Sequence, residues 1–327
     1  MSKRALLVGM GFYASMPELP GCVHDAKALR EVLARNEDGS PNYECRLLVY
    51  PGGPHITRTV LRAEWQRLFT GFTGDLLFYF AGHGSPAEAG GAIMTYEGTS
   101  AAPGLPMSEL IQLANESAAQ EVVIILDCCH SGAIGGTGRR RSGRTLEQHA
   151  RLREGVTILA ATRSQAASAE MGQGEDARGV FTSLLLAALQ GGAADVRGHI
   201  SAAAIYAYIE QALGAWDQRP LYKSFASHLA PIRRCIPQVS DALLRQLPRY
   251  FSAEDSHYRL DPSYEETQPS ADTHHVEIFK AFKSYRDARL LRTVQGDDLF
   301  FAALNEHEVE LTPIGRLYWR LATQERI

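Results

Sequence analysis

Short runs of β-branched or aliphatic residues alternate with segments of helical periodicity along residues 5–213. This alternation is typical of βαβ units and predicts a mostly parallel sheet covered by helices, that is, an α/β/α sandwich. The expected strands are Ala5–Val8, Arg46–Tyr50, Leu76–Phe80, Val122–Leu126 and Val156–Ala160. Apolar residues at helical spacing predict helices over 23–33, 60–68, Ser108–Asn115, Val180–Gln190 and Ser201–Leu213.

The alternation stops after Pro231, and we expect a domain boundary near Pro237. A chain of 327 residues exceeds the usual range of a single domain. We therefore divide it into a first domain at 1–236 and a smaller C-terminal domain at 237–327.

The C-terminal domain has its own pattern, in which helical spacing over 276–285 precedes two strand-like runs, Leu290–Val294 and Leu299–Ala303, around a polar turn. Thr312 is the expected N-cap of a closing helix, with Pro313 at the first helical position. Helix, hairpin and helix predict an α+β, winged-helix-like domain. The segment 311–316, Leu-Thr-Pro-Ile-Gly-Arg, resembles the one that often follows the wing in bacterial winged-helix proteins.

Charge and cysteine usage restrict the function. Residues 1–235 hold 22 basic and 22 acidic groups, and 236–327 hold 11 and 15, so neither part is suited to nucleic acid. Gly9 and Gly11 interrupt the first apolar run, and no apolar stretch is long enough to span a membrane, so we expect no signal peptide and no membrane partner. Five cysteines without disulfide-type spacing indicate a reducing, cytoplasmic setting.

Two polar clusters follow two of the expected strands. Phe80-Ala-Gly-His83-Gly84 comes after the third strand, and Asp127-Cys-Cys129-His-Ser-Gly comes after the fourth. The carboxyl ends of neighbouring parallel strands meet at one crevice. A His beside a Cys can hold it as a thiolate, and the flanking glycines let backbone N–H groups approach an oxyanion. The pattern predicts a nucleophilic Cys129 with His83 as its base.

These motifs carry a family resemblance. Tyr79-Phe-Ala-Gly-His-Gly84 and Asp127-Cys-Cys-His-Ser-Gly132 resemble the His and Cys motifs of metacaspases and bacterial caspase-like peptidases of clan CD, peptidase family C14. The spacing of 46 positions is close to the roughly fifty expected between His and Cys in caspases. Further landmarks are 5–9, 19–25 and 179–182. The resemblance implies a caspase-like fold over about residues 4–230, and a cysteine endopeptidase that acts on protein or peptide substrates.

Of the two adjacent cysteines, Cys129 has the family position of the nucleophile. Strand alternation agrees, because Asp127 and Cys129 share one side while Cys128 points to the other and is expected to pack. His130 is expected to be structural, and its use as the base would require a sharp local turn.

The resemblance also implies a pocket for the residue before the scissile bond. In metacaspases, aspartates at the positions of Asp25 and Asp127 line this pocket, and Cys22 and Ala81 fall at neighbouring pocket positions, although many members carry Ser in place of Ala81. Asp127 alternatively caps its strand or accepts loop N–H bonds. Two carboxylates favour a bound cation, so we expect cleavage after Arg or Lys.

The Gly- and Arg-rich loop Gly132–Arg144 follows the nucleophile, where caspase-like enzymes carry a linker that is often cut. We expect self-cleavage there, at the basic residues Arg139, Arg140, Arg141 and Arg144. The oxyanion donors would be the N–H groups of Gly84 and Cys129. No organic cofactor or metal is expected. Many metacaspases respond to calcium, but the sequence contains no EF-hand loop, so calcium activation stays open.

Other functions are also compatible with parts of the sequence. The chain could be a catalytically silent caspase-like adaptor or sensor whose C-terminal domain binds a regulatory protein partner. Inactive relatives commonly lack the His or the Cys, whereas this chain retains both His83 and Cys129. Residues 9–14 formally fit a dinucleotide fingerprint, but Pro17 and Pro20 interrupt the helix that it requires. Bacterial relatives are often linked to stress, cell death or defence against phage, which is an implication of the resemblance alone.

Overall fold

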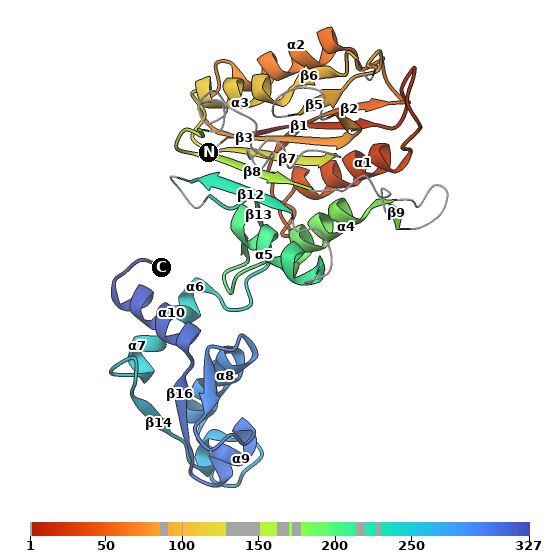
Figure 1. Cartoon of the computed structure of the whole chain (residues 1–327). Helices are drawn as coiled ribbons and strands as arrows, with labels where there is room; N and C mark the ends of the chain where they lie inside the picture. Colours follow the sequence, from red (N-terminus) through yellow and green to blue (C-terminus); the bar gives the residue numbers. More distant parts are fainter. Residues whose placement is uncertain are drawn as a thin grey trace, which may run out of the picture. The chain divides into compact units, whose positions relative to one another are not determined.

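The computed structural model describes residues 2–85, 91–99, 101–128, 151–161, 170–171, 178–213, 220–226 and 230–327 (Figure 1). The chain divides into two compact units. The first comprises Met1–Ala194 and His199–Cys235, and the second comprises Asp195–Gly198 and Ile236–Ile327. The assignment of the two parts of the chain as a peptidase domain and a winged-helix-like domain stays a prediction.

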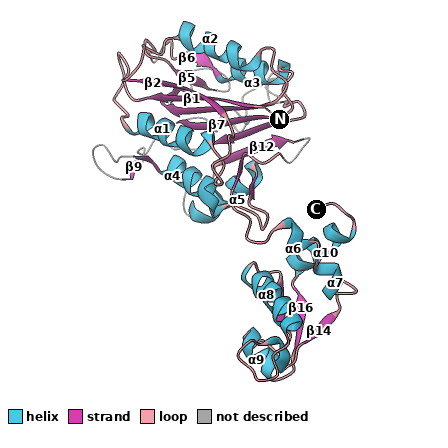
Figure 2. Cartoon of the chain, turned by 180° about the vertical axis from the view of Figure 1, so that it is seen from behind, coloured by secondary structure: helices cyan, strands magenta, loops and turns pink. Residues whose placement is uncertain are grey.

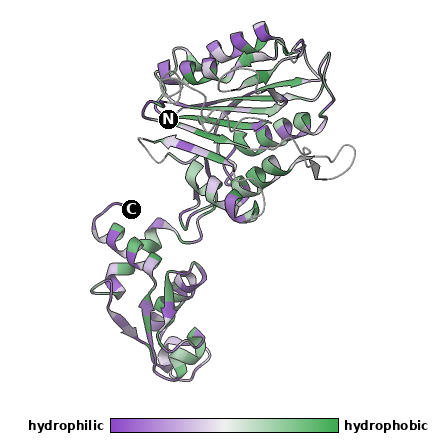
Figure 3. Ribbon diagram, in the orientation of Figure 1, coloured by the Kyte–Doolittle hydropathy of each residue, from purple (hydrophilic) through white to green (hydrophobic). Residues whose placement is uncertain are grey.

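A six-stranded sheet forms the centre of the first unit, in the order β12-β8-β7-β3-β1-β2. Its five parallel strands contain all five strands expected from the sequence, and β12 joins β8 in the antiparallel direction. Their bounds are β1 Lys3–Met10, β2 Glu44–Tyr50, β3 Asp75–Gly82, β7 Val122–Cys128, β8 Val156–Ala160 and β12 Leu221–Phe225. The apolar strands at the centre of this sheet are evident in Figure 3.

Helices cover both faces of the sheet (Figures 1 and 2). α2 (Arg58–Phe69) and α3 (Met107–Glu116) cover one face, where Trp65 packs edge-on against Phe78 with ring centroids 5.8 Å apart. α1 (Gly21–Ala34), α4 (Val180–Ala187) and α5 (Ala202–Leu213) cover the other. All five helices were expected, and alternate residues of the central strands feed the two cores, which confirms the caspase-like α/β sandwich.

The contact between α1 and β1 is very close. A Cβ at Gly9 would lie 2.4 Å from the carbonyl oxygen of Cys22 and 2.8 Å from the Cβ of Ala26. Only a residue without a side chain fits, so α1 packs directly on β1. This contact holds the first turns of α1, which carry Asp25, against the sheet.

Short elements complete the first unit. β4 (Gly84–Ser85), β5 (Ala92–Met94) and β6 (Gly104–Pro106) form a small antiparallel sheet directly after β3. Two further pairs are β9 (Glu170–Met171) with β10 (Arg178–Gly179), and β11 (His199–Ile200) with β13 (Arg233–Arg234). After α4, the chain continues as a π-helical turn at Ala188–Gly192, with Gly191 at a φ of 121°.

The second unit has its own core around α8 (Thr273–Asp287), whose Phe279, Phe282 and Tyr285 are almost fully buried, as their spacing predicts. Three antiparallel strands lie in the order β14-β16-β15. Its remaining elements are α6 (Asp241–Leu244), α7 (Leu247–Tyr250), β14 (His257–Arg259), a 3-10 turn (Pro262–Tyr264), β15 (Leu291–Thr293), α9 (Leu299–Leu304), β16 (Glu308–Leu311) and α10 (Pro313–Thr323).

One expectation for this unit is wrong and another is confirmed. The run Leu299–Ala303 was expected as a strand, but it forms α9, because the Asp298 side chain caps the helix by accepting from the N–H of Phe300 at 2.9 Å. The partner of β15 is therefore β16. Thr312 caps α10 as expected, accepting from the N–H of Gly315 at 3.1 Å. Over the described residues, no helix is both long and apolar enough to cross a membrane.

Candidate active site

The carboxyl ends of β3 and β7 lie side by side at the centre of the sheet. In the parallel register, Ala81 pairs with Asp127 and Gly82 pairs with Cys128. His83 is the next residue after β3, and Cys129 is the next residue after Cys128 in the chain. Cys129 itself lies outside the described residues, as do His130 and the four arginines of the expected cleavage loop (Arg139, Arg140, Arg141 and Arg144).

Three contacts fix the half-buried His83. Its backbone N–H donates to the hydroxyl of Tyr13 at 2.8 Å, and the two rings pack with centroids 4.9 Å apart. The ring Nε2 lies 2.9 Å from the carbonyl oxygen of Pro17. Because a carbonyl can only accept, Nε2 carries the proton in this hydrogen bond, and Nδ1 of the neutral ring is left as the acceptor. The imidazole is therefore held in the tautomer that a base requires.

A hydrogen-bonded chain holds Asp127. Its Oδ2 accepts from the hydroxyl of Thr182 at 2.7 Å, and the Thr182 oxygen lies 2.6 Å from the hydroxyl of Tyr79. Thr182 has one proton and gives it to the carboxylate, so Tyr79 donates to Thr182. Burial and then the charges of Asp25 and Asp127 raise the pKa of Tyr79 well above its ordinary value, which keeps this hydroxyl a donor.

Asp25 approaches the same place from α1. Its side chain is 1% exposed, and its Oδ2 accepts from the backbone N–H of Gly179 at 3.1 Å. The donors to the two carboxylates, Gly179 and Thr182, are only three positions apart in the chain, so Asp25 and Asp127 are held by one short segment. We call Asp25, Tyr79, Asp127 and Thr182 the acidic cluster.

The other expected site residues have different surroundings. Cys22 is half-buried on α1 and also acts on the pKa of Tyr79, whereas Ala81 is fully buried in the core beneath α1 and α4. Gly84 is half-buried and pairs with Ile93 in the small sheet. Cys128 is 1% exposed and packs in the opposite core, as strand alternation predicts.

Four residues at the site were not assigned a role from the sequence: Tyr13, Pro17, Tyr79 and Thr182. Tyr79 and Thr182 lie inside segments that the resemblance marks as landmarks, and Tyr79 shares a strand side with Ala81, so period-two alternation could have indicated it. Pro17 acts through its backbone carbonyl, which leaves no side-chain signal. Among the described residues, no three His, Cys, Asp or Glu side chains are grouped as a metal site would require.

A parallel sheet with one antiparallel edge strand, helices on both faces, and a His at one strand tip beside an Asp-Cys at the next defines the class of caspase-like α/β domains. The family model of the caspase domain, peptidase C14, matches residues 2–245, and the chain belongs to this family of cysteine peptidases.

Individual relatives match over shorter stretches. Metacaspase-1 of Arabidopsis thaliana is 36% identical over 87 residues, which are 25% of this chain and 24% of that protein. Metacaspase-6 of the same plant is 25% identical over 178 residues, 50% of this chain and 48% of that protein. The chain thus matches from about a quarter to about half of the length of these relatives.

Among solved structures, caspase-1 from Spodoptera frugiperda aligns with a TM-score of 0.48 and 13% identity, covering 71% of this chain and 90% of that one. A structure of pro-sf-caspase-1 aligns with a TM-score of 0.43 and 11% identity, covering 71% and 91%.

Proposed function

We propose that the chain is a cysteine endopeptidase in which His83 activates Cys129 to cleave peptide bonds after Arg or Lys. The observation that carries the proposal is the register of β3 and β7. Gly82 pairs with Cys128, and these residues immediately precede the base and the nucleophile. Membership of the caspase-domain family supports the same reaction.

In the proposed mechanism, Nδ1 of His83 takes the proton of the Cys129 thiol while Nε2–H stays bound to the carbonyl of Pro17. The thiolate attacks the scissile carbonyl, and the N–H groups of Gly84 and Cys129 stabilise the oxyanion. The imidazolium then protonates the leaving amine as the peptide bond breaks. His83 next deprotonates a water molecule, which hydrolyses the thioester and regenerates the thiol.

The preference for a basic residue rests on the acidic cluster. Asp25 and Asp127 are 1% and 5% exposed, so the electrostatic effect of each is weakly screened by water. A guanidinium or ammonium bound nearby would relieve their mutual repulsion and form charge-assisted hydrogen bonds. An acidic side chain in the same place would add a third negative charge. The same preference would allow the enzyme to cut its own loop at Arg139–Arg141 or Arg144.

The compartment is part of the proposal, since a catalytic thiol must stay reduced. Cys45 and Cys235 are free thiols, which supports a reducing, cytoplasmic setting.

The experiment compares the full chain with Cys129→Ala, His83→Ala and the matched control Cys128→Ala, using fluorogenic peptides that end in Arg, Lys, Asp or Leu. We expect the first two variants to lose at least about 1,000-fold in kcat/KM on Arg peptides, because the nucleophile or its base is gone. Cys128→Ala, which removes only a packed thiol, should retain most of the activity. Full activity of Cys129→Ala would exclude the mechanism.

Specificity and self-cleavage are read in the same preparation. Arg and Lys peptides should be cleaved at least about 100-fold faster than Asp peptides, because only a cation is favoured beside two carboxylates. A faster reaction with Asp peptides would contradict the pocket assignment. Mass spectrometry of the incubated enzyme should show cuts in the Gly132–Arg144 loop that Cys129→Ala lacks. An enzyme that stays intact while it cleaves peptides would refute self-processing alone.

A further inference from the structure

In the part of the chain that the structure describes, β2 is an edge strand of the central sheet. Among the described strands, β2 pairs only with β1, over all seven of its residues. The opposite side of an edge strand presents backbone N–H and C=O groups that another extended chain can pair with. An edge of this kind is a place where a peptide can add to the sheet.

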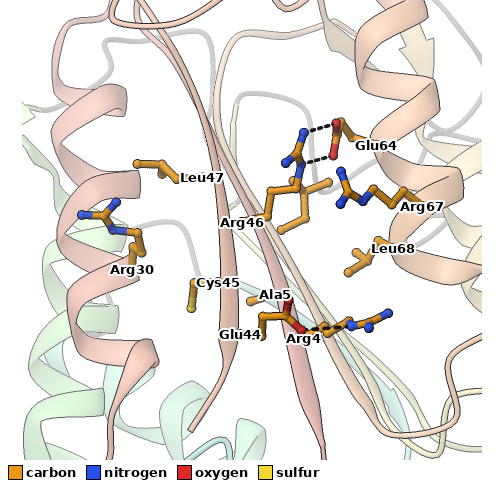
Figure 4. Close-up of a pocket in the computed structure, with 11 residues that line it drawn as sticks. Arg4, Ala5, Arg30, Glu44, Cys45, Arg46, Leu47, Glu64, Arg67 and Leu68 are labelled. Atoms are coloured by element: carbon orange, nitrogen blue, oxygen red, sulfur yellow. Dashed lines mark hydrogen bonds and ion pairs between the residues drawn. The ribbon is translucent and has the colours of Figure 1, made fainter. Parts of the chain in front are cut away.

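A groove of about 500 Å³ straddles this edge (Figure 4). Its walls are α1 and α2, and Figure 4 shows Arg30 on the side of α1 and Arg67 on the side of α2, with β2 between them. Cys45 and Leu47 of β2 lie between these walls. We call this site the β2 groove.

The charges of the β2 groove are unequal. Four arginines and two glutamates line it. Both glutamates are engaged: Glu44 pairs with Arg4 at 3.2 Å, and Glu64 forms a two-pronged pair with Arg46. Arg30 and Arg67 are exposed, and neither makes a hydrogen bond or an ion pair with any residue in the described part of the chain. Two guanidinium groups, one on each wall, thus form no ion pair with a described residue.

We propose that the β2 groove binds an extended acidic segment of a partner protein, which adds as a strand to β2 and places one carboxylate at Arg30 and another at Arg67. Neighbouring side chains of a strand point to opposite faces of the sheet. Since the two arginines stand on opposite faces, the two acidic residues of the ligand must be an odd number of positions apart. The arginine guanidinium is suited to this task because it can bind a carboxylate through two parallel hydrogen bonds.

Charge also argues against a second copy of the chain as the occupant. A symmetric pairing of β2 with β2 would bring the same groove, with its excess of positive charge, against itself. An acidic strand meets the opposite sign on both walls.

The test is fluorescence anisotropy of the full chain with a labelled, acetylated heptapeptide of Thr and Val that carries adjacent Glu and Asp at its centre. Three control peptides have the two acids replaced by Gln and Asn, the two acids separated by one residue, or alternate backbone nitrogens methylated. We expect saturable 1:1 binding of the first peptide that weakens with added salt. Each control should bind at least about tenfold more weakly, because it lacks the charges, the facing or the strand hydrogen bonds.

Protein variants assign the site. Arg30→Glu/Arg67→Glu should weaken binding at least about tenfold, with a smaller loss for Arg30→Gln/Arg67→Gln, because reversal replaces attraction with repulsion. Arg245→Glu, which changes an exposed arginine of the second unit, is the matched control and should bind as the parent does. Equal affinity of the charge-reversed protein, or undiminished binding of the methylated peptide, would overturn the proposal. So would self-association of the chain that Arg30→Glu/Arg67→Glu abolishes, because a second copy would then be the occupant.

Discussion

The acidic cluster and the β2 groove are both charged sites on one sheet, and they hold their charges in opposite ways. In the acidic cluster, Asp25 and Asp127 are 1% and 5% exposed, and each accepts a hydrogen bond from the protein. In the β2 groove, Arg30 and Arg67 are exposed and have no such partner among the described residues.

The difference follows from the cost of removing charge from water. A buried carboxylate must be compensated by donors, so the acidic cluster draws residues from α1, β3, β7 and α4. An exposed arginine remains hydrated and needs no internal partner. Changes in the acidic cluster should therefore affect both stability and specificity, whereas changes in the β2 groove should affect binding with little effect on folding.

Loss of the Thr182 hydroxyl should have the largest effect. Thr182→Val keeps the shape of a residue that is 0% exposed, but it removes the hydroxyl that donates to Asp127 Oδ2 and that accepts from Tyr79. We expect a loss of about 3 kcal/mol in the free energy of unfolding, measured by urea denaturation. Ser183→Ala, one position along α4, is the control and should change it by less than about 0.5 kcal/mol. Equal stabilities of the two variants would contradict the expectation that the acidic cluster contributes to folding.

The thiol of Cys45, which lines the β2 groove, should react slowly with alkylating agents. Burial raises the pKa of Cys45 from 9.0 to about 11, although the charge of Arg30 opposes the rise. At pH 8, the thiolate fraction should thus be about 100-fold below that of an ordinary cysteine. Iodoacetamide labelling followed by peptide mass spectrometry measures the rate, with the urea-unfolded chain as reference. If Cys45 of the native protein were labelled at a rate within threefold of the unfolded rate, its thiol would be open to water, against the prediction.

Because Tyr79 is buried, alkaline pH should lower the free energy of unfolding. Its pKa is raised in the folded protein, so the unfolded state loses this proton first, and stability falls as the pH rises above the ordinary value of 10.0. Between pH 10 and 11, this group should contribute a loss of about 1 kcal/mol. Tyr79→Phe lacks this contribution, so its unfolding free energy should fall less steeply over that interval. Parallel pH profiles of the two proteins would contradict the prediction.

The smallest effect is expected at the rim of the β2 groove. Glu44 has a side chain that is 79% exposed, and its pair with Arg4 is open to solvent. Glu44→Gln should change the unfolding free energy by less than about 0.5 kcal/mol. Because it frees Arg4, the same variant should bind the acidic heptapeptide at least as tightly as the parent. Weaker peptide binding by Glu44→Gln would argue against recognition by charge.

The sequence predicted most of the sheet because its central strands are continuous apolar runs of strand length, as in Val122–Leu126. It missed β12, which has four half-buried residues and one exposed residue and carries no clear period. It misread Leu299–Ala303 because a short apolar run has no decisive periodicity, although Asp298 offered a capping signal.

The candidate site divides in the same way. His83, Asp25 and Asp127 stand out in the sequence because their side chains carry chemistry within recognisable motifs. The tautomer of His83 depends on a carbonyl, that of Pro17, and the hydroxyl chain to Asp127 depends on the position of Thr182, 55 residues away in the sequence. Contacts of these kinds depend on the folded backbone, and no local sequence pattern predicts them. The position of Cys129 lies outside the described residues, so its role stays a prediction.

The residues of the acidic cluster come from distant parts of the chain, so the cluster can form only after a late segment has been synthesised. Asp25 accepts a hydrogen bond from the amide of Gly179, and Asp127 accepts one from the hydroxyl of Thr182. Both hydrogen bonds therefore require a segment that is synthesised late. A ribosome that has released only the first 170 residues has already produced His83 and the Cys128-Cys129 pair of the sequence, but it has not yet produced Gly179 and Thr182, which donate to the two carboxylates. The order of synthesis alone thus delays completion of the acidic cluster until the helix that begins at Val180 has emerged.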